Sequence, residues 1–325
     1  MPYINLPPIV LTLILSILGF AILIKFADLF VDGAASLARN FKISGTVVGL
    51  TIVAFGTSAP ELAISFNSHL SGNTDMMLGN VVGSNIANIL FIFGLAILIK
   101  PFKVVKDVAR KEMPILMLIT LGLAIVLSDN FFDITKENTI SRNDGVMLLL
   151  LFSVFVYYLI TIIKESRQNE IESEPKYKIP KSVFITLFGL AGIIFGSALV
   201  VENVAEFAVI IGISQKIIAV TVVSIGTSLP ELVTTIVAAK KGENGMAIGN
   251  IVGSNIFNAC IVLGLPVALL GEVTTQTFNI IDVIFLLLAV ALLWIFVAGR
   301  GEIKRYEGII LIAIYCAYIA YIFLQ

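Results

Sequence analysis

Charged residues are scarce in this sequence, and histidine and cysteine are almost missing. Of 325 residues, 13% are charged, one is histidine and two are cysteine. The 21 basic and 22 acidic side chains nearly cancel, which excludes the strongly basic surface of a nucleic-acid-binding protein. No cluster of histidine and cysteine exists to hold zinc, haem or an iron-sulfur centre. We therefore expect no nucleic-acid partner and no cofactor, and the sequence indicates no obligate protein partner.

Apolar residues are abundant instead. They make up 58% of the chain, whose mean hydropathy is +1.03, whereas soluble domains are about half apolar and about a quarter charged. A helix that crosses a bilayer needs about 20 mostly apolar residues, and ten windows of the sequence meet this requirement. The predicted fold class is therefore an all-α integral membrane protein with ten transmembrane helices. The windows are residues 8 to 30, 45 to 68, 77 to 99, 113 to 128, 144 to 163, 182 to 202, 215 to 239, 247 to 270, 280 to 298 and 306 to 324.

Basic residues gather on one side of the predicted membrane. The connections after odd-numbered spans hold 18 lysines and arginines, and the other side holds three, Lys136, Arg142 and Lys216. Because basic loops stay in the cytoplasm, both termini are predicted to be extracellular or periplasmic, in a multi-pass protein of the plasma membrane. No basic residue precedes Lys25, so we expect the first apolar run to be a span rather than a cleaved signal.

The sequence also repeats itself. A shift of 170 residues aligns 51–66 with 221–236 and 79–90 with 249–260, with no gap between the two blocks. The first block carries the motif Gly-Thr-Ser-x-Pro-Glu in both copies. The second block carries Gly-Asn-x-Val-Gly-Ser-Asn-Ile-x-Asn in both copies.

This repeat divides the chain into two halves of five spans each. We expect a first five-helix repeat at 1–163 with its motif region at 51–90, a cytoplasmic linker at 164–181, and a second repeat at 182–325 with its motif region at 221–260. An odd number of spans makes the second copy enter the membrane from the opposite side. Inverted repeats of this kind are typical of secondary transporters. Gene duplication also builds static scaffolds and channels, which are the alternatives on symmetry alone.

The first motif places a proline inside an apolar span. Pro60 and Pro230 lack an amide donor and clash with the carbonyl four residues earlier, so each helix is predicted to break. Broken backbone in a bilayer is tolerated where protein, water or an ion satisfies it. Glu61 and Glu231 follow the prolines, and neither motif contains a lysine or arginine to pair with them. The charge that compensates the glutamates is therefore expected to be a bound cation or a proton. The alternative is that both glutamates are protonated and serve only as hydrogen-bonding groups that stabilise the structure.

The polar atoms around the predicted breaks are hard oxygens, which suit Na⁺ and Ca²⁺. In each second motif a serine and an asparagine lie four residues apart, on one helical face. The glycines Gly79, Gly83, Gly249 and Gly253 are expected to allow close helix packing. The candidate cation-binding groups are Glu61, Thr57, Ser58, Ser84, Asn88 and the carbonyl of Ala54 in the first copy, and Glu231, Thr227, Ser228, Ser254, Asn258 and the carbonyl of Ser224 in the second.

In this order and in two copies, the motifs resemble the alpha-1 and alpha-2 repeats of the cation/Ca²⁺ exchanger superfamily, closest to its prokaryotic Na⁺/Ca²⁺ exchanger branch. The resemblance spans essentially the whole chain. It implies that spans 2, 3, 7 and 8 surround the ion sites and that spans 1 and 6 slide across them as a gate. It also implies that Glu61 and Glu231 share Ca²⁺ in competition with Na⁺, beside Thr57 and Thr227. By the same resemblance, one flanking Na⁺ site involves Ser58, Ser84 and Ala54, and the other Ser228, Ser254 and Ser224.

Two positions depart from the family pattern. Asn258 stands where K⁺-dependent relatives often carry aspartate, so we expect no K⁺ requirement. Ser224 should change little, because the family ligand there is a backbone carbonyl. The predicted function is secondary active antiport of Na⁺ against Ca²⁺ by alternating access, electrogenic because the family's three Na⁺ per Ca²⁺ would move one net charge. H⁺/Ca²⁺ antiport is the alternative, although that branch has an acidic residue soon after Gly-Asn. An enzyme is not expected, since no histidine or lysine accompanies the motif serines as a general base.

Overall fold

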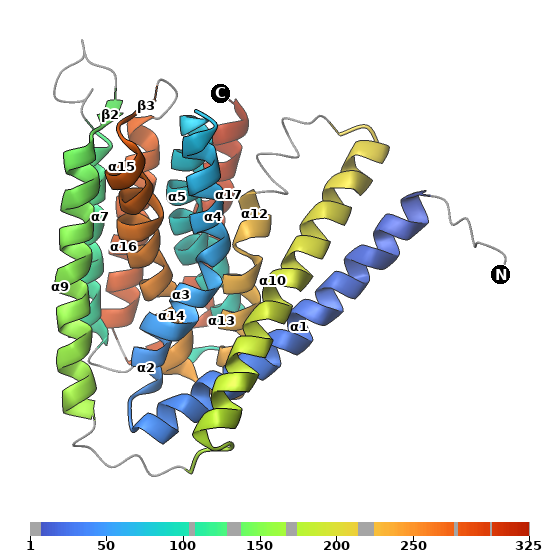
Figure 1. Ribbon diagram of the computed structural model, residues 1–325, viewed down its shortest axis with the longest axis vertical. Helices are drawn as coiled ribbons and strands as arrows, with labels where there is room; N and C mark the ends of the chain where they lie inside the picture. The colour runs from blue at the N-terminus through green and yellow to red at the C-terminus, as the bar shows by residue number, and fades with distance from the viewer. Residues whose placement is uncertain are drawn as a thin grey trace.

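The structure is a computed structural model that describes residues 8–103, 108–128, 138–166, 174–213, 224–275, 279–299 and 301–324. Within these residues the chain is helical apart from two pairs of very short strands. Most of the helices form one bundle, and two long helices lean away from it (Figure 1). The predicted all-α fold is confirmed.

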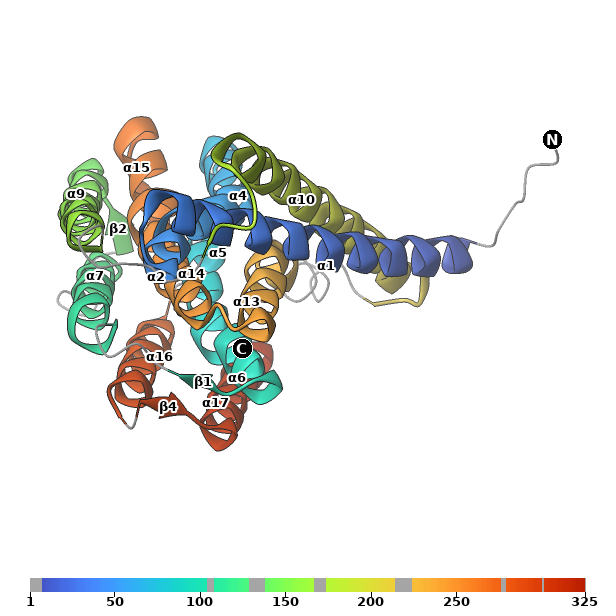
Figure 2. The ribbon, with the colours of Figure 1, turned by 90° about the horizontal axis from the view of Figure 1, so that it is seen from below.

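The two leaning helices are the longest in the molecule. α1 (Pro8–Phe41) and α10 (Ile179–Ile210) have 34 and 32 residues, and they run antiparallel side by side (Figures 1 and 2). Glycine allows their close approach, because a Cβ added at Gly33 would lie 2.7 Å from the amide nitrogen of Thr186. Both helices are longer than the predicted spans, since each continues through charged residues that a hydropathy window excludes.

Two spans of the bundle break at matching places. The first bends by 44° at Ser58, and the second breaks at Ser228, so the breaks predicted from the prolines are confirmed. Each proline lies in the first turn of the new helix, where its missing amide is not needed. The first span consists of α2 (Gly45–Val48), the π-helical η1 (Gly49–Val53), α3 (Ala54–Thr57) and α4 (Ala59–Leu70), and the second of α12 (Ser224–Thr227) and α13 (Leu229–Lys241).

The helices that carry the second motif follow each broken span. Both contain a π-helical segment that starts at the same repeat position, Asn88 in one and Asn258 in the other. Such segments are frequent at functional sites, because the wider turn changes the direction of the side chains. The elements are α5 (Thr74–Ala87), η2 (Asn88–Phe93) and α6 (Gly94–Ile99) in the first half, and α14 (Asn244–Phe257), η5 (Asn258–Leu263) and α15 (Gly264–Leu270) in the second.

The remaining helices and the strand pairs lie around this centre. Strand β1 pairs antiparallel with β4, and β2 pairs antiparallel with β3. In Figure 1 the β2–β3 pair lies at the top of the bundle, at the same end as the C-terminus. The elements are β1 (Phe102–Lys103), η3 (Val108–Glu112), α7 (Met113–Val126), β2 (Asn138–Ile140), α9 (Arg142–Ser166), β3 (Val273–Thr275), α16 (Ile280–Ala298), β4 (Glu302–Ile303) and α17 (Arg305–Leu324).

Seven of the described helices are long and apolar enough to cross a membrane, and the bent span from Gly45 to Leu70 makes eight. The two further predicted spans were 113–128 and 215–239. In the first of these, α7 has only 14 residues. In the second, residues 214–223 lie outside the described part of the chain. The outer surface is apolar, as a lipid-facing surface must be, and large side chains such as Ile17 are 69% exposed on it.

Helix α14 crosses the first broken span at small residues. A Cβ at Gly249 would lie 2.5 Å from the carbonyl oxygen of Thr46, and one at Gly253 would lie 2.7 Å from the Cβ of Ala54. The close packing predicted for these two glycines is confirmed. At Gly79 nothing among the described residues lies within 4 Å of the added Cβ, so the packing predicted there stays a prediction. The repeat places its partner segment at 216–220, which is not described.

Candidate cation site

The two motif glutamates lie at the centre of the helix bundle. Glu61 is in the first turn of α4 and Glu231 in the first turn of α13, and both are 0% exposed. The residues at the breaks have the same backbone conformation, with φ −86° and ψ 7° at Ser58 and φ −88° and ψ 6° at Ser228. A helix N-terminus favours negative charge, so each break places a carboxylate where the new helix stabilises it.

Hydrogen bonds between the two repeats bring their motifs together in one site. The hydroxyl of Ser58 in the first repeat donates to Oε1 of Glu231 in the second at 3.0 Å. The amide of Asn258 donates to the hydroxyl of Ser84 at 3.0 Å. These contacts join residues 173 and 174 positions apart in the chain. The four residues belong to the predicted site, and the structure places all four in its buried interior.

Many oxygens of the site have no hydrogen-bond partner within the described residues. Both carboxylate oxygens of Glu61 and Oε2 of Glu231 are in this condition, and no lysine or arginine of the described chain forms an ion pair with either glutamate. A buried carboxylate without a partner is costly, because burial removes its hydration. Two carboxyl groups surrounded by neutral oxygens form the kind of ligand set that hard cations prefer. The neutral groups with unpartnered buried atoms are the side chains of Asn88, Ser228, Ser254 and Asn258.

The two candidate threonines differ in burial. The two residues whose backbone carbonyls are candidate ligands, Ala54 and Ser224, differ in how much of them the structure describes. Thr57 is fully buried, and its hydroxyl donates to Asn250 Oδ1 at 3.2 Å and lies 3.0 Å from the carbonyl of Val53. Thr227 is only partly buried. The carbonyl of Ala54 accepts the amide of Ser58 at 3.0 Å, so only one of its two lone pairs is left for an ion. Ser224 begins α12, and its side chain lies outside the described part of the structure.

Supporting residues that the candidate set lacked surround the glutamates. Asn80 donates to the backbone carbonyl of Glu61 at 3.0 Å and to the hydroxyl of Ser65 at 3.3 Å. In the second repeat, Asn250 donates to Thr235 at 2.9 Å. Ser65 and Thr235 match in the repeat alignment, four residues after each glutamate. A hydroxyl at the same place in both copies was the signal that could have identified them.

One contact has no counterpart in the other half. The hydroxyl of Ser197, on α10, donates at 3.0 Å to the carbonyl of Gly226. This carbonyl lies four residues before Pro230, so the proline supplies no amide to it. The repeat places Ala27 on α1 where Ser197 lies on α10. The second break is thus joined to α10 by a side-chain hydrogen bond, whereas an alanine cannot make this bond at the first.

The chain is similar to known proteins both in sequence and in fold. Two stretches of the chain, residues 11–161 and 181–324, match the family described as sodium/calcium exchanger protein. The inner membrane protein YrbG of Escherichia coli is 36% identical in an alignment 291 positions long, which covers 84% of this chain and 87% of the relative. The sodium/calcium exchanger MaX1 of Methanosarcina acetivorans is 31% identical in an alignment 349 positions long, which covers 97% of this chain and 99% of the relative.

The fold also matches solved structures of the sodium-calcium exchanger NCX_Mj. For the crystal soaked with Na⁺ and zero Ca²⁺, the TM-score is 0.82 at 31% sequence identity. The match covers 96% of this chain and 99% of the other. It therefore extends over both halves, including the long leaning helices and the two broken spans.

Proposed function

Because this chain belongs to the sodium/calcium exchanger family of membrane transporters, which are not enzymes, we propose that it exchanges Na⁺ for Ca²⁺ by alternating access. The observation that carries the proposal is the pair of fully buried glutamates, Glu61 and Glu231, linked across the repeats through Ser58. One Ca²⁺ neutralises both carboxylates, and so do Na⁺ ions that bind the same oxygens. Ca²⁺ and Na⁺ bound at the same time would leave excess positive charge in a medium of low dielectric constant. Binding of Ca²⁺ therefore excludes binding of Na⁺ and the reverse, so that one ion is exchanged for the other.

The proposed ligands are the twelve groups predicted from the motifs. Ca²⁺ binds between the two glutamates, with the oxygens of Thr57 and Thr227 and the amides of Asn88 and Asn258 beside it. Na⁺ occupies the same region and two flanking positions. The first flanking position uses Ser58, Ser84 and the carbonyl of Ala54, and the second uses Ser228, Ser254 and the carbonyl of Ser224. The unpartnered buried oxygens of this set support the assignment.

The proposed architecture is two inverted repeats, 1–163 and 182–325, joined by a cytoplasmic linker at 164–181, with both termini on the outer side. The excess of basic residues on the linker side supports this orientation. The family match also falls in two stretches that leave out 162–180. Helices α1 and α10 occupy equivalent places in the two repeats and are the proposed gate.

Charge controls the proposed cycle. A site without ions would hold two buried carboxylates with no compensating charge, so movement of the gate without ions is disfavoured. With three Na⁺ exchanged per Ca²⁺, one net charge crosses the membrane in each cycle, and the rate responds to voltage. Because Asn258 contributes no third negative charge, K⁺ is not needed to balance the site.

Transport by reconstituted protein tests this proposal. Ca²⁺ uptake is measured in proteoliposomes loaded with Na⁺ and diluted into Na⁺, K⁺ or choline solutions, and then under a pH gradient without Na⁺. We expect uptake only with an outward Na⁺ gradient, with no increase from added K⁺. Uptake driven by the pH gradient alone would contradict the proposal and assign the coupling ion to H⁺.

A further inference from the structure

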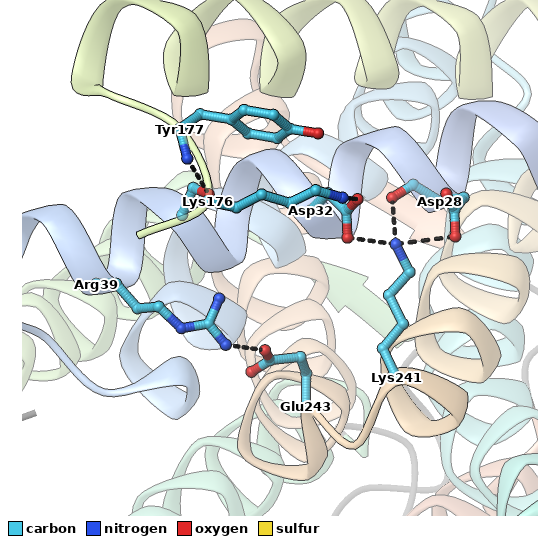
Figure 3. A network of polar contacts seen from close by, with 8 residues as sticks. Asp28, Asp32, Arg39, Lys176, Tyr177, Lys241 and Glu243 are labelled. Atoms are coloured by element: carbon cyan, nitrogen blue, oxygen red, sulfur yellow. Dashed lines mark hydrogen bonds and ion pairs between the residues drawn. The ribbon is translucent and has the colours of Figure 1, made fainter. Parts of the chain in front are cut away.

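Ion pairs join α1 to α13 and α14 at the end of the molecule where the linker lies (Figure 3). The ammonium of Lys241, the last residue of α13, lies 2.8 Å from Oδ1 of Asp28 and also pairs with Asp32, one turn further along α1. Near the end of α1, Arg39 pairs with Glu243 at 2.6 Å, in the turn between α13 and α14. These five residues, Asp28, Asp32, Arg39, Lys241 and Glu243, are called the ionic latch below.

The linker is bound to the same part of α1. Lys176 donates to Oδ2 of Asp32 at 2.5 Å, and this hydrogen bond is the main reason that the pKa of Lys176 lies above its ordinary value. The backbone of Tyr177 donates to the hydroxyl of Ser36 at 3.2 Å and accepts the amide of Asn40 at 2.7 Å. The end of α1 is therefore held from two sides, by the bundle and by the linker.

The latch is partly shielded from water. The side chains of Asp32, Arg39, Lys241 and Glu243 are between 17% and 28% exposed. Partly buried charges are screened by salt less than exposed ones. The pairs therefore resist separation of α1 from α13 more than ion pairs on an open surface would.

Within the described residues, the repeat gives these ion pairs no counterpart at the other end of the molecule. In the alignment, Asp32 corresponds to Glu202 on α10, whereas Lys241 corresponds to Ser71 at the end of α4. Arg39 likewise corresponds to an uncharged residue, Val209. Glu202 forms no ion pair within the described residues. If the two repeats exchange conformations to close the opposite side, no equivalent pair among the described residues holds that closure.

We propose that the ionic latch holds the gate helix α1 against α13 and α14, keeps the cytoplasmic side of the cation site closed, and biases the resting protein toward its outward-facing state. This inference rests on the proposed alternating access. In this proposal, five residues outside the cation site determine the balance between the two states of the gate. Removing one pair shifts this balance by roughly two- to fivefold, the range expected for partly exposed ion pairs.

The test measures access to the closed interface. Ala38, which is 5% exposed near the end of α1, is replaced by cysteine as a reporter. Labelling by a membrane-impermeant maleimide is followed from the cytoplasmic side in NaCl, with the chain lacking the reporter as the blank. Lys241→Gln removes the pairs with both Asp28 and Asp32 and should raise the labelling rate by roughly two- to thirtyfold. Lys240→Gln is the matched control, since it removes the same charge from the neighbouring exposed residue and should leave the rate unchanged.

A charge exchange provides the second measurement. Arg39→Glu should speed labelling, because it places two carboxylates together, and the double variant Arg39→Glu/Glu243→Arg should restore the slow rate. Size-exclusion chromatography identifies variants that fail to fold. Equal labelling rates for Lys241→Gln and Lys240→Gln would contradict the proposed latch. A correctly folded double variant that is still labelled fast would also contradict it. Labelling requires no Ca²⁺ transport, so a failed Na⁺/Ca²⁺ exchange assay would contradict the proposed function while this result is read separately.

Discussion

The isosteric change Glu61→Gln removes one of the two buried charges of the proposed Ca²⁺ site. Both carboxylate oxygens of Glu61 are unpartnered within the described residues, so the whole charge is available to an ion. A buried pair of opposite charges that loses one partner is destabilised by about 3–5 kcal/mol. In the proposed site that pair is the Glu61 carboxylate and the bound Ca²⁺. For Ca²⁺ this corresponds to a dissociation constant raised by roughly two to four orders of magnitude. Glu231→Gln should have an effect of the same size, because it leaves the same net charge.

Isothermal titration of Ca²⁺ into the purified protein measures this effect. The matched control is Glu112→Gln, since Glu112 is also buried, at 4% exposed, but its carboxylate accepts the hydroxyl of Tyr158 at 2.6 Å outside the proposed site. This control should bind Ca²⁺ as the native chain does. A dissociation constant for Glu61→Gln within threefold of the native value, in folded protein, would refute the assignment of the two glutamates.

Three further changes test separate parts of the structure. Gly249→Ala should lower the melting temperature, because overpacking costs roughly 1–3 kcal/mol; an unchanged melting temperature in scanning fluorimetry would contradict the packing described. Ser197→Ala leaves the Gly226 carbonyl without its side-chain donor and should cost about 1–3 kcal/mol, measured as a lower denaturation midpoint; an unchanged midpoint would mean that the carbonyl needs no such donor. Asn258→Asp adds a third carboxylate and should tighten Ca²⁺ binding by roughly tenfold; weaker binding in calorimetry would place position 258 away from the ion.

The membrane fold and the helix breaks follow from local properties of the sequence. Apolar length predicted most helix positions, and the window 280 to 298 coincides with α16 (Ile280–Ala298). Proline chemistry predicted the breaks near Pro60 and Pro230. The end of α1 was missed because charged residues there form ion pairs with distant parts of the chain, which hydropathy does not measure. The end of α10 was missed because Glu202 and Glu206 lower the mean hydropathy of any window that includes them.

The composition of the candidate site was predictable, but its contacts were not. A repeat alignment matches each residue with its own counterpart, such as Ser58 with Ser228. It does not indicate that Ser58 contacts Glu231, because that contact depends on how the two copies pack together. For the same reason the hydrogen bond that the Thr57 hydroxyl donates to Asn250 and the π-helical segments at Asn88 and Asn258 appear only in the structure.

The central claim is that Na⁺ and Ca²⁺ compete for one site built from both repeats. Equilibrium binding of radioactive Ca²⁺ to the purified protein, measured with increasing Na⁺ and with K⁺ at the same ionic strength, tests this claim most directly. We predict that Na⁺ displaces all bound Ca²⁺ with a steep, cooperative dependence and that K⁺ displaces none beyond the effect of ionic strength. Ca²⁺ that remains bound at saturating Na⁺ would contradict the account.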